Sequence, residues 1–388
     1  MTKEKQPETK TRDVKTTKSK AHIMRPKGEP RPMPSDYSIS LGAKGDADQQ
    51  LFNPGTERRQ SMQGFEDTYV DIIDYIVRIT HKIWEEKDIG YIYDTYAHNS
   101  RVWDGMGLQY GRDKIVADTV HTVNAFPNVR LYADEIVWAG NDEVGFHTSH
   151  RTVIKGTNTG FSRFGPPTGR NIEVWCIANC IALNNEIFEE WVLYDNAHLI
   201  RQLGFDLVEK AREAGNNRKD IDFQDPRSGQ PERLPGQGKP KLLKYNPGDT
   251  LDIPDFLQTT YHNIWNRRHL SVVQQSHNSS LTVLSSNGRK MYGRGAFQSY
   301  ILSFLALFPD LAFEIDDIYW MGNDQDDYIT SMRWTIKGHH GGWGIYGPPT
   351  NRPVRMWGIT QHHIRNGEIH AEWMMFNEFE LMQQIFKD

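Results

Sequence analysis

The sequence has few cysteines and no long apolar run, and each absence excludes a class of protein. Among its 388 residues only Cys176 and Cys180 are cysteines. On one predicted strand they would stand roughly 13 Å apart, too far for a disulfide, so we expect reduced thiols in a cytoplasmic protein. No stretch approaches the ~20 apolar residues of a membrane helix, and the polar first residues lack the apolar segment of a signal peptide.

Signatures of cofactor, metal and nucleic-acid binding are also missing. The glycine-rich segment at 338–342 is not followed by the Lys-Ser or Lys-Thr of a phosphate-binding loop. Adjacent histidines such as His339 and His340 would point to opposite faces of a strand, and no carboxylate has ligand spacing to them. A formal net charge of −5 gives no general attraction for nucleic acid. We therefore expect no cofactor, no metal, no nucleic acid and no membrane partner.

The strongest pattern that is present is an internal repeat. The segment Gly165-Pro166-Pro167-Thr168-Gly169-Arg170 recurs as Gly347-Pro348-Pro349-Thr350-Asn351-Arg352, 182 residues later (347 − 165). The same offset links Phe126-Pro127 to Phe308-Pro309. Two copies at so long a period indicate two globular domains rather than a stack of short repeats.

Composition places the domain boundaries. Residues 1–64 are rich in Lys, Pro, Thr and Gly and show no hydrophobic period, which predicts a disordered arm or one draped over a domain. We expect domains at 65–210 and 250–388, joined by a Pro- and Gly-rich linker at 211–249. The linker is long enough for the domains to pair face to face about an internal pseudo-twofold axis, and association into a homo-oligomer stays open.

Hydrophobic spacing predicts the same elements in each copy. In the first copy it predicts a helix over 69–84 and a second over 115–123, which Phe126-Pro127 ends. Asp252 is the expected N-cap of the first helix of the second copy, and Asn366-Gly367 its last hairpin turn. β-Branched and aromatic residues predict strands at 131–138, 143–154, 173–181 and 187–194. Helices followed by a long antiparallel meander indicate an α+β fold, duplicated, with helices on one face of a curved sheet.

The order of motifs in each copy resembles a known family. After Phe126-Pro127 come a Gly-Asn-Asp turn, an Arg strand, a Gly-Thr-x-x-Gly turn, the Gly-Pro-Pro-Thr-Gly-Arg loop, a Glu-x-Trp-x-x-x-Asp strand and Leu-x-x-Gln-Leu-Gly. This order resembles the SnoaL-like polyketide cyclase ("ester cyclase") branch of the NTF2-like superfamily, over 65–210 and 250–388. The resemblance implies a cone-shaped half barrel in each copy, whose wide end opens into an apolar pocket. The superfamily holds cyclases, isomerases, epoxide hydrolases, dehydratases and binding modules, so the fold alone does not choose a reaction.

The resemblance also implies an acid/base carboxylate on the last strand, and the pattern places it at Asp195. Strand alternation puts Glu189 and Trp191 on the same face as Asp195, and Glu190 and Tyr194 on the other. An apolar pocket would raise the pKa of Asp195 by desolvation, towards the range useful for proton abstraction. The alternative is that Asp195 caps or pairs locally at the end of the strand.

The second copy departs from the first at these positions. Ala371 and Asn377 stand where the first copy has Glu189 and Asp195. The second copy has therefore either lost its chemistry and supports the first, or has a differently equipped pocket. Glu190 is kept in the second copy, and we expect it to be structural.

Histidines are the other candidate groups for chemistry. His98 and His277 both precede Asn-Ser, at a helix-to-strand entry that lines the pocket mouth in the family fold. They are expected to orient a carbonyl group, with His98 as the second catalytic candidate; the alternative is that they satisfy backbone groups at a turn. His340 stands in the glycine-rich turn where the first copy has Asn158.

Three functions fit these candidates. The first is a cofactor-independent cyclase, isomerase or lyase that moves a proton next to a carbonyl of a small apolar or aromatic molecule, with Asp195 as acid/base. The second is an epoxide or ester hydrolase that uses Glu189 as a second carboxylate, and the third is a non-catalytic binding protein. The expected contacts with the small molecule are Glu189, Trp191, Tyr194, Trp103, His277, His340 and Asn377.

Overall fold

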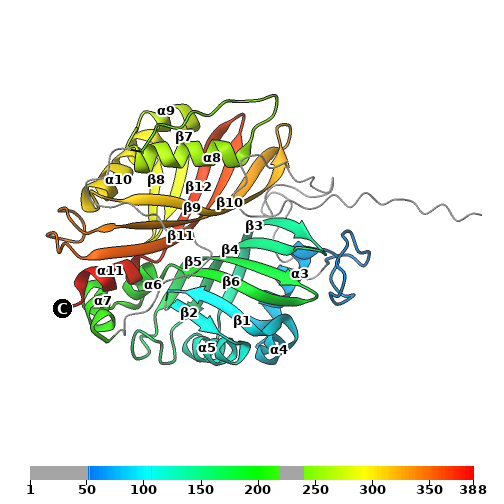
Figure 1. Ribbon diagram of the computed structural model, residues 1–388. Coiled ribbons are helices and arrows are strands. Elements are labelled where there is room, and N and C mark those ends of the chain that lie inside the picture. Colours follow the sequence, from blue (N-terminus) through cyan, green and yellow to red (C-terminus); the bar gives the residue numbers. More distant parts are fainter. Residues whose placement is uncertain (1–50, 52, 106, 218–239) are drawn as a thin grey trace, which may run out of the picture.

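The computed structural model describes residues 51, 53–105, 107–217 and 240–388. The predicted arm over 1–50 and the linker segment 218–239 therefore lie outside the described residues. Figure 1 shows two antiparallel-rich sheets, each with helices on one side. This arrangement confirms the predicted duplicated α+β fold. Among the described residues, no helix is both long and apolar enough to cross a membrane.

The first domain consists of a six-stranded sheet with its helices. The strands follow the order β2-β1-β6-β5-β4-β3, and β1 pairs with β6 in parallel while the other pairs are antiparallel. Its elements are α3 (Ile72–Trp84), η1 (Ile89–Tyr91), α4 (Ile92–Thr95), β1 (Tyr96–Asp104), β2 (Gly107–Tyr110), α5 (Arg112–Ala125), β3 (Arg130–Asn141), β4 (Gly145–Thr157), β5 (Asn171–Leu183), β6 (Glu186–Tyr194), α6 (Asn196–Leu203) and α7 (Leu207–Asn217).

The second domain repeats this layout, with the strand order β8-β7-β12-β11-β10-β9. Its elements are α8 (Ile253–Tyr261), η2 (His262–Asn266), α9 (Val272–Ser276), β7 (His277–Ser285), β8 (Arg289–Tyr292), α10 (Gly293–Leu307), β9 (Ala312–Asn323), β10 (Asp327–His339), β11 (Pro353–Arg365), β12 (Glu368–Phe376) and α11 (Glu378–Phe386).

Local signals in the sequence explain where several elements begin and end. The Asp252 side chain caps α8 by accepting from the Asp255 N–H at 3.1 Å, as its position before Pro254 predicts. Helix α5 ends at Ala125, directly before the Phe126-Pro127 pair. Asn366 and Gly367 have φ values of +50° and +73°, as a tight two-residue hairpin turn requires.

The ends of the first domain differ in extent from the predicted boundaries. Helix α7 continues through residue 210 to Asn217, so its last turns lie within the predicted linker. On the other side, the described part of the predicted arm packs on the first domain. Met62 is buried, and the Arg59 N–H donates to the Val70 carbonyl at 2.8 Å.

At β1 and β7, the strand register aligns the two copies differently from the alignment that their shared residues suggest. Tyr96 lies opposite Ile187 in the first sheet, and His277 lies opposite Ile369 in the second. Since 187 and 369 are equivalent at the 182-residue offset, the counterpart of His277 is Tyr96, and the predicted match with His98 is wrong. The turn between β7 and β8 is one residue longer than that between β1 and β2, which compensates for the shift.

Each sheet has an inner face, which its helices cover, and an opposite outer face. In the first domain Ile136 lies on the inner face, in one core cluster with Tyr75 of α3. His150, Ala178 and Val192 continue the same cross-strand row from β4 to β6, so they share the inner face.

The outer faces of the two sheets pack against each other. The guanidinium of Arg151 lies 3.6 Å from the ring centre of Trp373, and that of Arg333 lies 4.3 Å from the ring centre of Trp191. These two contacts exchange under the 182-residue offset, which is the relation that a local twofold axis produces.

Polar and apolar contacts between the sheets repeat the same symmetry. The Asn179 amide donates to Ser331 Oγ at 3.2 Å, and the Gln361 amide donates to Ser149 Oγ at 2.8 Å. Each of these residues has its counterpart in the other bond. An apolar cluster across the two sheets is formed by Ile177, Trp191, Leu193, Ile359 and Met375.

Candidate functional site

Both carboxylate oxygens of Asp195 are engaged by backbone N–H groups. Oδ1 accepts from His198 N at 3.3 Å, which caps α6, and from Asn287 N at 2.7 Å; Oδ2 accepts from Gly288 N at 3.1 Å. Burial raises the pKa of Asp195, although the N–H groups of Asn287 and Gly288 oppose that shift. Asn377 caps α11 in the same way, accepting from Glu380 N at 3.1 Å. The contacts of Asp195 are therefore those of the capping alternative.

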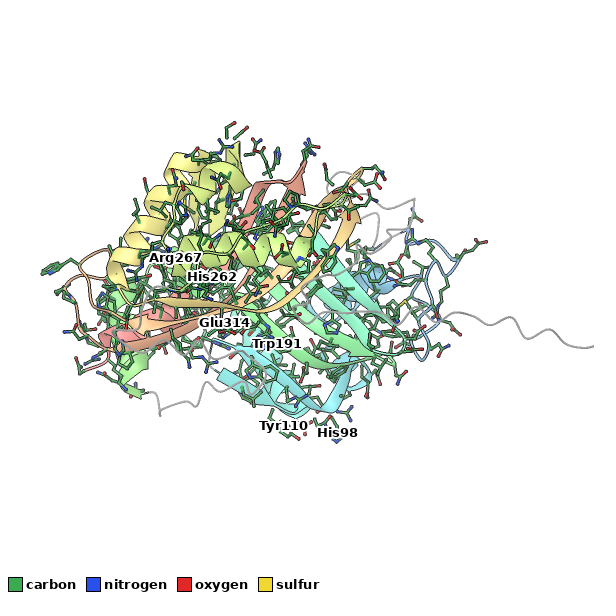
Figure 2. All side chains as sticks on the ribbon, turned by 45° about the horizontal axis from the view of Figure 1, so that its top comes forward. His98, Tyr110, Trp191, His262, Arg267 and Glu314 are labelled. Carbon is green, nitrogen blue, oxygen red and sulfur yellow. The ribbon has the colours of Figure 1, made fainter. Side chains whose placement is uncertain are left out.

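The predicted pocket face of β6 is the outer face of the sheet. Trp191 packs in the cluster between the two sheets, and Figure 2 shows it between them. Trp103 stacks on Trp191 with ring centres 5.0 Å apart and ring planes 7° apart. Glu189 is buried and forms an ion pair with Arg101. Strand alternation separated the two faces as expected, but this face contacts the second domain.

The three candidate histidines lie in three different environments. His98 is exposed on β1, and Figure 2 shows it at the outer rim near Tyr110. His277 is fully buried, with Nε2 2.8 Å from Glu372 Oε1. His340 is buried in the loop after β10, with Nδ1 3.2 Å from Thr350 Oγ1. The structure therefore brings none of them next to Asp195.

The inner face of the first domain carries a different carboxyl group. Glu190 alternates with Trp191 along β6 and so points to the helices; the Tyr96 hydroxyl donates to its Oε2 at 3.0 Å. Burial raises the pKa of Glu190 to about 7, with a further contribution from the nearby Asp104 carboxylate and an opposing one from the Tyr96 hydrogen bond. This value lies in the range where a carboxyl group can both accept and release a proton near neutral pH.

His150 is the second polar group on this inner face. It is 5% exposed, and its Nε2 has no hydrogen-bond partner among the described residues. Burial lowers the pKa of His150 to about 4, so the ring is neutral at physiological pH. A neutral imidazole with one unused nitrogen can form a hydrogen bond with a bound carbonyl or hydroxyl group.

Side chains beside Glu190 and His150 are partly accessible to water, although they belong to an inner face. Val102, Cys176 and Val192 form an apolar cluster there. Cys176 and Cys180 are free thiols on this face, as the sequence predicts. The half-buried members of the surface are Ile115, Ile154, Ala178 and Tyr194.

The equivalent surface of the second domain is closed. The counterparts of the four half-buried residues are all at most 2% exposed, namely Phe297, Ile336, Thr360 and Phe376. Trp334 occupies the centre, stacked on Phe313 with ring centres 5.3 Å apart and donating from its indole N–H to Thr360 Oγ1 at 2.9 Å. A Cβ on Gly358 would lie 2.2 Å from the Trp334 ring, so glycine is needed beneath the indole. Thr152 and Cys176 hold the equivalent positions in the first domain.

Glu372 also has a different environment from its counterpart Glu190. It is bonded to His277, whose Nδ1 lies 2.8 Å from Ser276 Oγ. Burial alone would raise the pKa of Glu372, but the hydrogen bond and charge of His277 and the nearby His362 lower it below its ordinary value.

The sequence predicts a structural role for Glu190, because the residue is present in both copies. A signal was available: its strand face also carries Val192 and Tyr194, an apolar and aromatic pair of the kind expected in a pocket. The outer face of β6 is equally apolar, since it packs on another sheet, and alternation alone does not say which face is which.

The chain was compared with curated proteins and with solved structures. A search of the curated proteins finds no match. Similar solved structures include a putative SnoaL-like polyketide cyclase from Jannaschia sp., with 12% identity over 33% of this chain and 90% of that one, at a TM-score of 0.30. Another is IdmH, a putative polyketide cyclase from Streptomyces antibioticus, with 19% identity over 34% and 95% and a TM-score of 0.29. A ketosteroid isomerase-like protein from Catenulispora acidiphila, solved with trimethylamine, has 18% identity over 35% and 95% and a TM-score of 0.29.

The family comparison covers both domains. Residues 74–203 and 255–385 each match the family model described as SnoaL-like polyketide cyclase. Each domain accordingly matches the SnoaL-like domain that the sequence predicts. Because the two matches together span more than half of the chain, the protein belongs to the SnoaL-like polyketide cyclase family and carries two copies of its domain.

Proposed function

We propose that the chain is a cofactor-independent enzyme of the cyclase, isomerase or lyase type, whose site is the inner face of the first domain. The substrate is a small, largely apolar or aromatic carbonyl compound, and Glu190 is the acid/base group. One observation carries this proposal: Glu190 is a buried carboxyl group with a pKa of about 7 on a partly water-accessible apolar surface. We assign the role to Glu190 rather than to Asp195, because backbone N–H groups occupy both Asp195 oxygens.

The proposed step is a proton transfer at carbon. The Glu190 carboxylate takes the proton from the carbon next to the substrate carbonyl, which leaves an enolate and a neutral carboxylic acid. The enolate then takes the proton back at another atom, attacks a second carbonyl, or expels a leaving group, according to the substrate. Burial holds the pKa of the Tyr96 phenol well above its ordinary value, so it remains a donor to Glu190 throughout. His150 is the group on this face suited to bond the substrate oxygen.

A hydrolase is the second candidate, and Asp104 favours it. Asp104 lies close enough to Glu190 to raise its pKa, and Gln109 donates to Asp104 Oδ1 at 3.4 Å. Two neighbouring carboxyl groups can activate a water molecule between them. In a hydrolase Asp104→Asn would abolish turnover, whereas proton transfer at carbon by Glu190 requires only one carboxylate.

Deuterium incorporation next to a carbonyl group tests the proposal without knowledge of the natural substrate. A panel of 1,3-dicarbonyl compounds and aromatic ketones is incubated with the protein in D₂O and followed by NMR. We expect Glu190→Gln to slow the exchange by ~10²–10⁴, the usual contribution of a positioned acid/base group. Glu372→Gln and Asp195→Asn are the matched controls and should keep the exchange within about tenfold of wild type.

Two results would overturn the assignment. If well-folded Asp195→Asn loses the exchange while Glu190→Gln keeps it, Asp195 is the acid/base group. If panel compounds stabilise the wild-type protein in thermal shift but none exchanges, the inner face binds small molecules without catalysis. Circular dichroism of every variant confirms that the fold is retained.

A further inference from the structure

We infer that the substrate of the first domain carries an anionic group, a carboxylate or a phosphate, which Arg163 and Tyr194 bind at the end of the inner face. Arg163 lies in the loop 158–170 between β4 and β5, and Tyr194 is the last residue of β6. The inference rests on the proposed function, since it takes the inner face of the first domain as the substrate site. It adds the chemical class of the substrate.

The loop holds Arg163 at the tip of a tight turn. The N–H groups of Ser162 and Gly165 each donate to the carbonyl of the other, at 3.0 and 3.2 Å, so Arg163 and Phe164 form the turn between them. Phe164 is buried and packs edge-on against Phe379, with ring centres 5.7 Å apart. One turn residue thus anchors the loop in the core, and the other is exposed.

The base of the loop is fixed to helix α5, which covers part of the inner face. Asn158 is buried, and its side-chain amide donates to the Ala125 carbonyl at 3.2 Å; the Gly160 N–H donates to the same carbonyl at 3.2 Å. Ile115 of this helix packs on the apolar cluster beside Glu190. The loop therefore lies next to the surface on which we place the substrate.

Arg163 and Tyr194 are close to each other, and the fold does not use their polar groups. Burial raises the pKa of the Tyr194 phenol well above its ordinary value, and the Arg163 guanidinium is close enough to oppose that rise. The phenol is therefore protonated at physiological pH. Among the residues that the structure describes, neither side chain has a hydrogen bond or ion pair. A guanidinium and a phenol with unused donors are together suited to an oxyanion.

The second domain lacks both donors but keeps the backbone that presents them. Ile345 and Phe376 stand where the first domain has Arg163 and Tyr194. The turn that carries Ile345 has the same pair of backbone bonds, at 3.3 and 2.9 Å. The donors are thus absent from the domain whose inner face is closed. This difference is expected if they serve a substrate rather than the fold.

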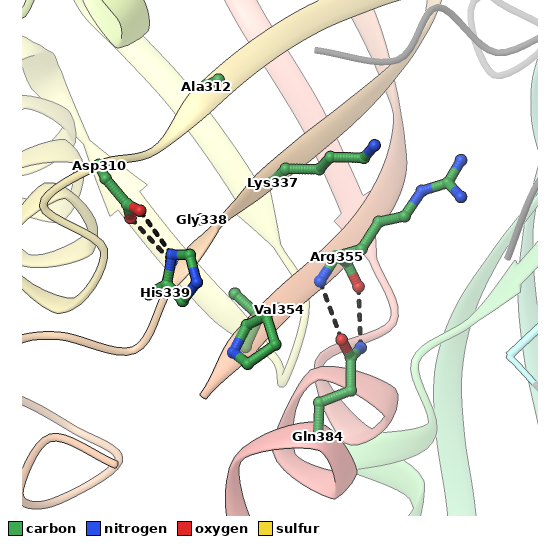
Figure 3. A pocket seen from close by; sticks show the side chains of 9 residues that line it. Asp310, Ala312, Lys337, Gly338, His339, Val354, Arg355 and Gln384 are labelled. Carbon is green, nitrogen blue, oxygen red and sulfur yellow. Dashed lines mark hydrogen bonds and ion pairs between the residues drawn. The ribbon is translucent and has the colours of Figure 1, made fainter. Parts of the chain in front are cut away.

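Cations in the groove of the second domain differ from Arg163. Figure 3 shows this groove of ≈ 340 Å³, whose lining includes Lys337 and Arg355. Both cations have partners within the chain, and His339 is bonded there to Asp310 at 2.6 Å. The charged groups of the groove are therefore already engaged, whereas Arg163 has no such partner among the described residues.

Spacing along β6 indicates the length of the substrate. Glu190 and Tyr194 share the inner face and are four residues apart, roughly 13 Å along the strand. The carboxylates of Asp104 and Glu190 contribute to the raised pKa of Tyr194, so they are close enough to repel an anion. The anionic group is then best accommodated on the Arg163 side of the phenol. It lies many bonds from the reacting carbon, as in a long oxo acid.

Matched ketones test the inference by deuterium exchange next to their carbonyl group. The compounds are 9-oxodecanoate, its methyl ester, 8-oxononyl phosphate, and 4-oxopentanoate as a short acid. We expect a kcat/KM for one long anion ~10-fold or more above that of the ester, as for a charge-assisted contact, and above that of the short acid. The long anion with the higher value identifies the group. Arg163→Ile, which copies the second domain, should bring its ratio to the ester close to one by raising KM. Tyr194→Phe should lower the ratio by less.

Arg170→Ile is the matched control, because Arg170 lies in the same loop but donates to the Gln202 carbonyl at 3.5 Å. It should keep the ratio of the wild type. Equal kcat/KM for the long anions and the ester in the wild type would overturn the inference and leave Glu190 as the acid/base group. An unchanged ratio in well-folded Arg163→Ile would do the same.

Thermal shift separates this inference from the proposed function. If none of the ketones exchanges, the proposed proton transfer fails, and the rise in Tm with each compound tests the anion site alone. A larger rise with a long anion than with the ester, lost in Arg163→Ile, supports the site. Equal rises, or no rise with any compound, contradict it.

Discussion

An equivalent glutamate lies at the centre of both inner faces, yet the pKa values of the two residues are shifted in opposite directions. Glu190 accepts a hydrogen bond from a tyrosine and has a pKa raised to about 7, whereas Glu372 is bonded to a histidine and has a lowered pKa. Both are buried, so burial pushes both pKa values upward. The difference teaches that the hydrogen-bond partner sets the direction of the pKa shift. An imidazole that can carry positive charge stabilises a buried carboxylate, and a neutral phenol does so far less.

The packing around the two glutamates also differs, since it is looser around Glu190 than around Glu372. The first domain keeps half-buried side chains on its inner face, while Trp334 and its aromatic neighbours close the second. A charged, hydrogen-bonded glutamate in a filled core is a structural element, and a titratable one on an accessible surface is a functional candidate. The filled core therefore lies in the second domain, and the site that we propose lies in the first.

The largest expected effect on stability comes from removing the Trp334 side chain from the core of the second domain. Trp334→Ala should lower the free energy of unfolding by about 3–5 kcal/mol, because it removes a buried indole and leaves a cavity over Gly358. Urea denaturation followed by circular dichroism measures it. Thr152→Ala, at the equivalent position of the first domain, is the control and should cost about 1 kcal/mol. Equal costs for the two changes would mean that the domains are packed alike.

The next largest effect is expected in the pH dependence of stability when each of the two glutamates is replaced by glutamine. The pKa of Glu190 rises on folding from 4.5 to about 7, so the folded protein keeps a proton that the unfolded chain loses. Its contribution to stability is present below about pH 4.5 and is lost as the pH rises through 7. Glu190→Gln should therefore be more stable than wild type at pH 8, by up to about 3 kcal/mol at 1.36 kcal/mol per pKa unit, and equal to it near pH 4.

Glu372→Gln is the counterpart and should show the opposite sign. Since the folded pKa of Glu372 is lowered, its contribution is present above its ordinary value of 4.5 and is lost as the pH falls. The variant should be less stable than wild type at pH 7, and the deficit should shrink on acidification. Chemical denaturation at pH 4, 6 and 8 measures both variants. Parallel pH curves for them would contradict the assignment of opposite environments.

Much of the fold could be predicted because it rests on local signals that occur twice. The Phe126-Pro127 stop, the Asp252 cap and the Asn366-Gly367 turn each have one physical reading, and the structure confirms them. The sequence did not predict strands β1 and β2, which form one side of the first sheet. Strand β1 contains the polar run His98-Asn99-Ser100 and shows no clear alternation, since it is held by pairing with β6 rather than by its own pattern.

The candidate site was harder to predict, for a reason that the duplication itself supplies. A single domain with one solvated face would show its pocket as the apolar side of β6, but here the other sheet covers the outer face as well. Trp191 therefore looks like a pocket residue and is an interface residue. Likewise, the His-Asn-Ser sequence that follows at both His98 and His277 suggested that the two histidines are equivalent. The strand register shows that they are two positions apart, and such a shift cannot be seen in the composition of the strands.

The smallest expected effect is that of Asp195→Asn. Asparagine caps helices about as well as aspartate does, and Asn377 performs this role in the second domain. An asparagine at 195 keeps one oxygen for His198 N and Asn287 N and loses the bond from Gly288 N. The loss of one such bond corresponds to about 1 kcal/mol of unfolding free energy.

Turnover separates this structural role from a catalytic one. If Asp195 is a cap and a link to the β7–β8 turn, Asp195→Asn should retain turnover within about tenfold. Asn377→Asp is the reciprocal change in the second domain, where Asn377 Nδ2 lies 1.6 Å from the place that a Cβ on Gly105 would take. A fall of more than ~10² in turnover with unchanged stability would return the acid/base role to Asp195. Since the two glutamates would then both be structural, the contrast between the domains would lie in their packing alone.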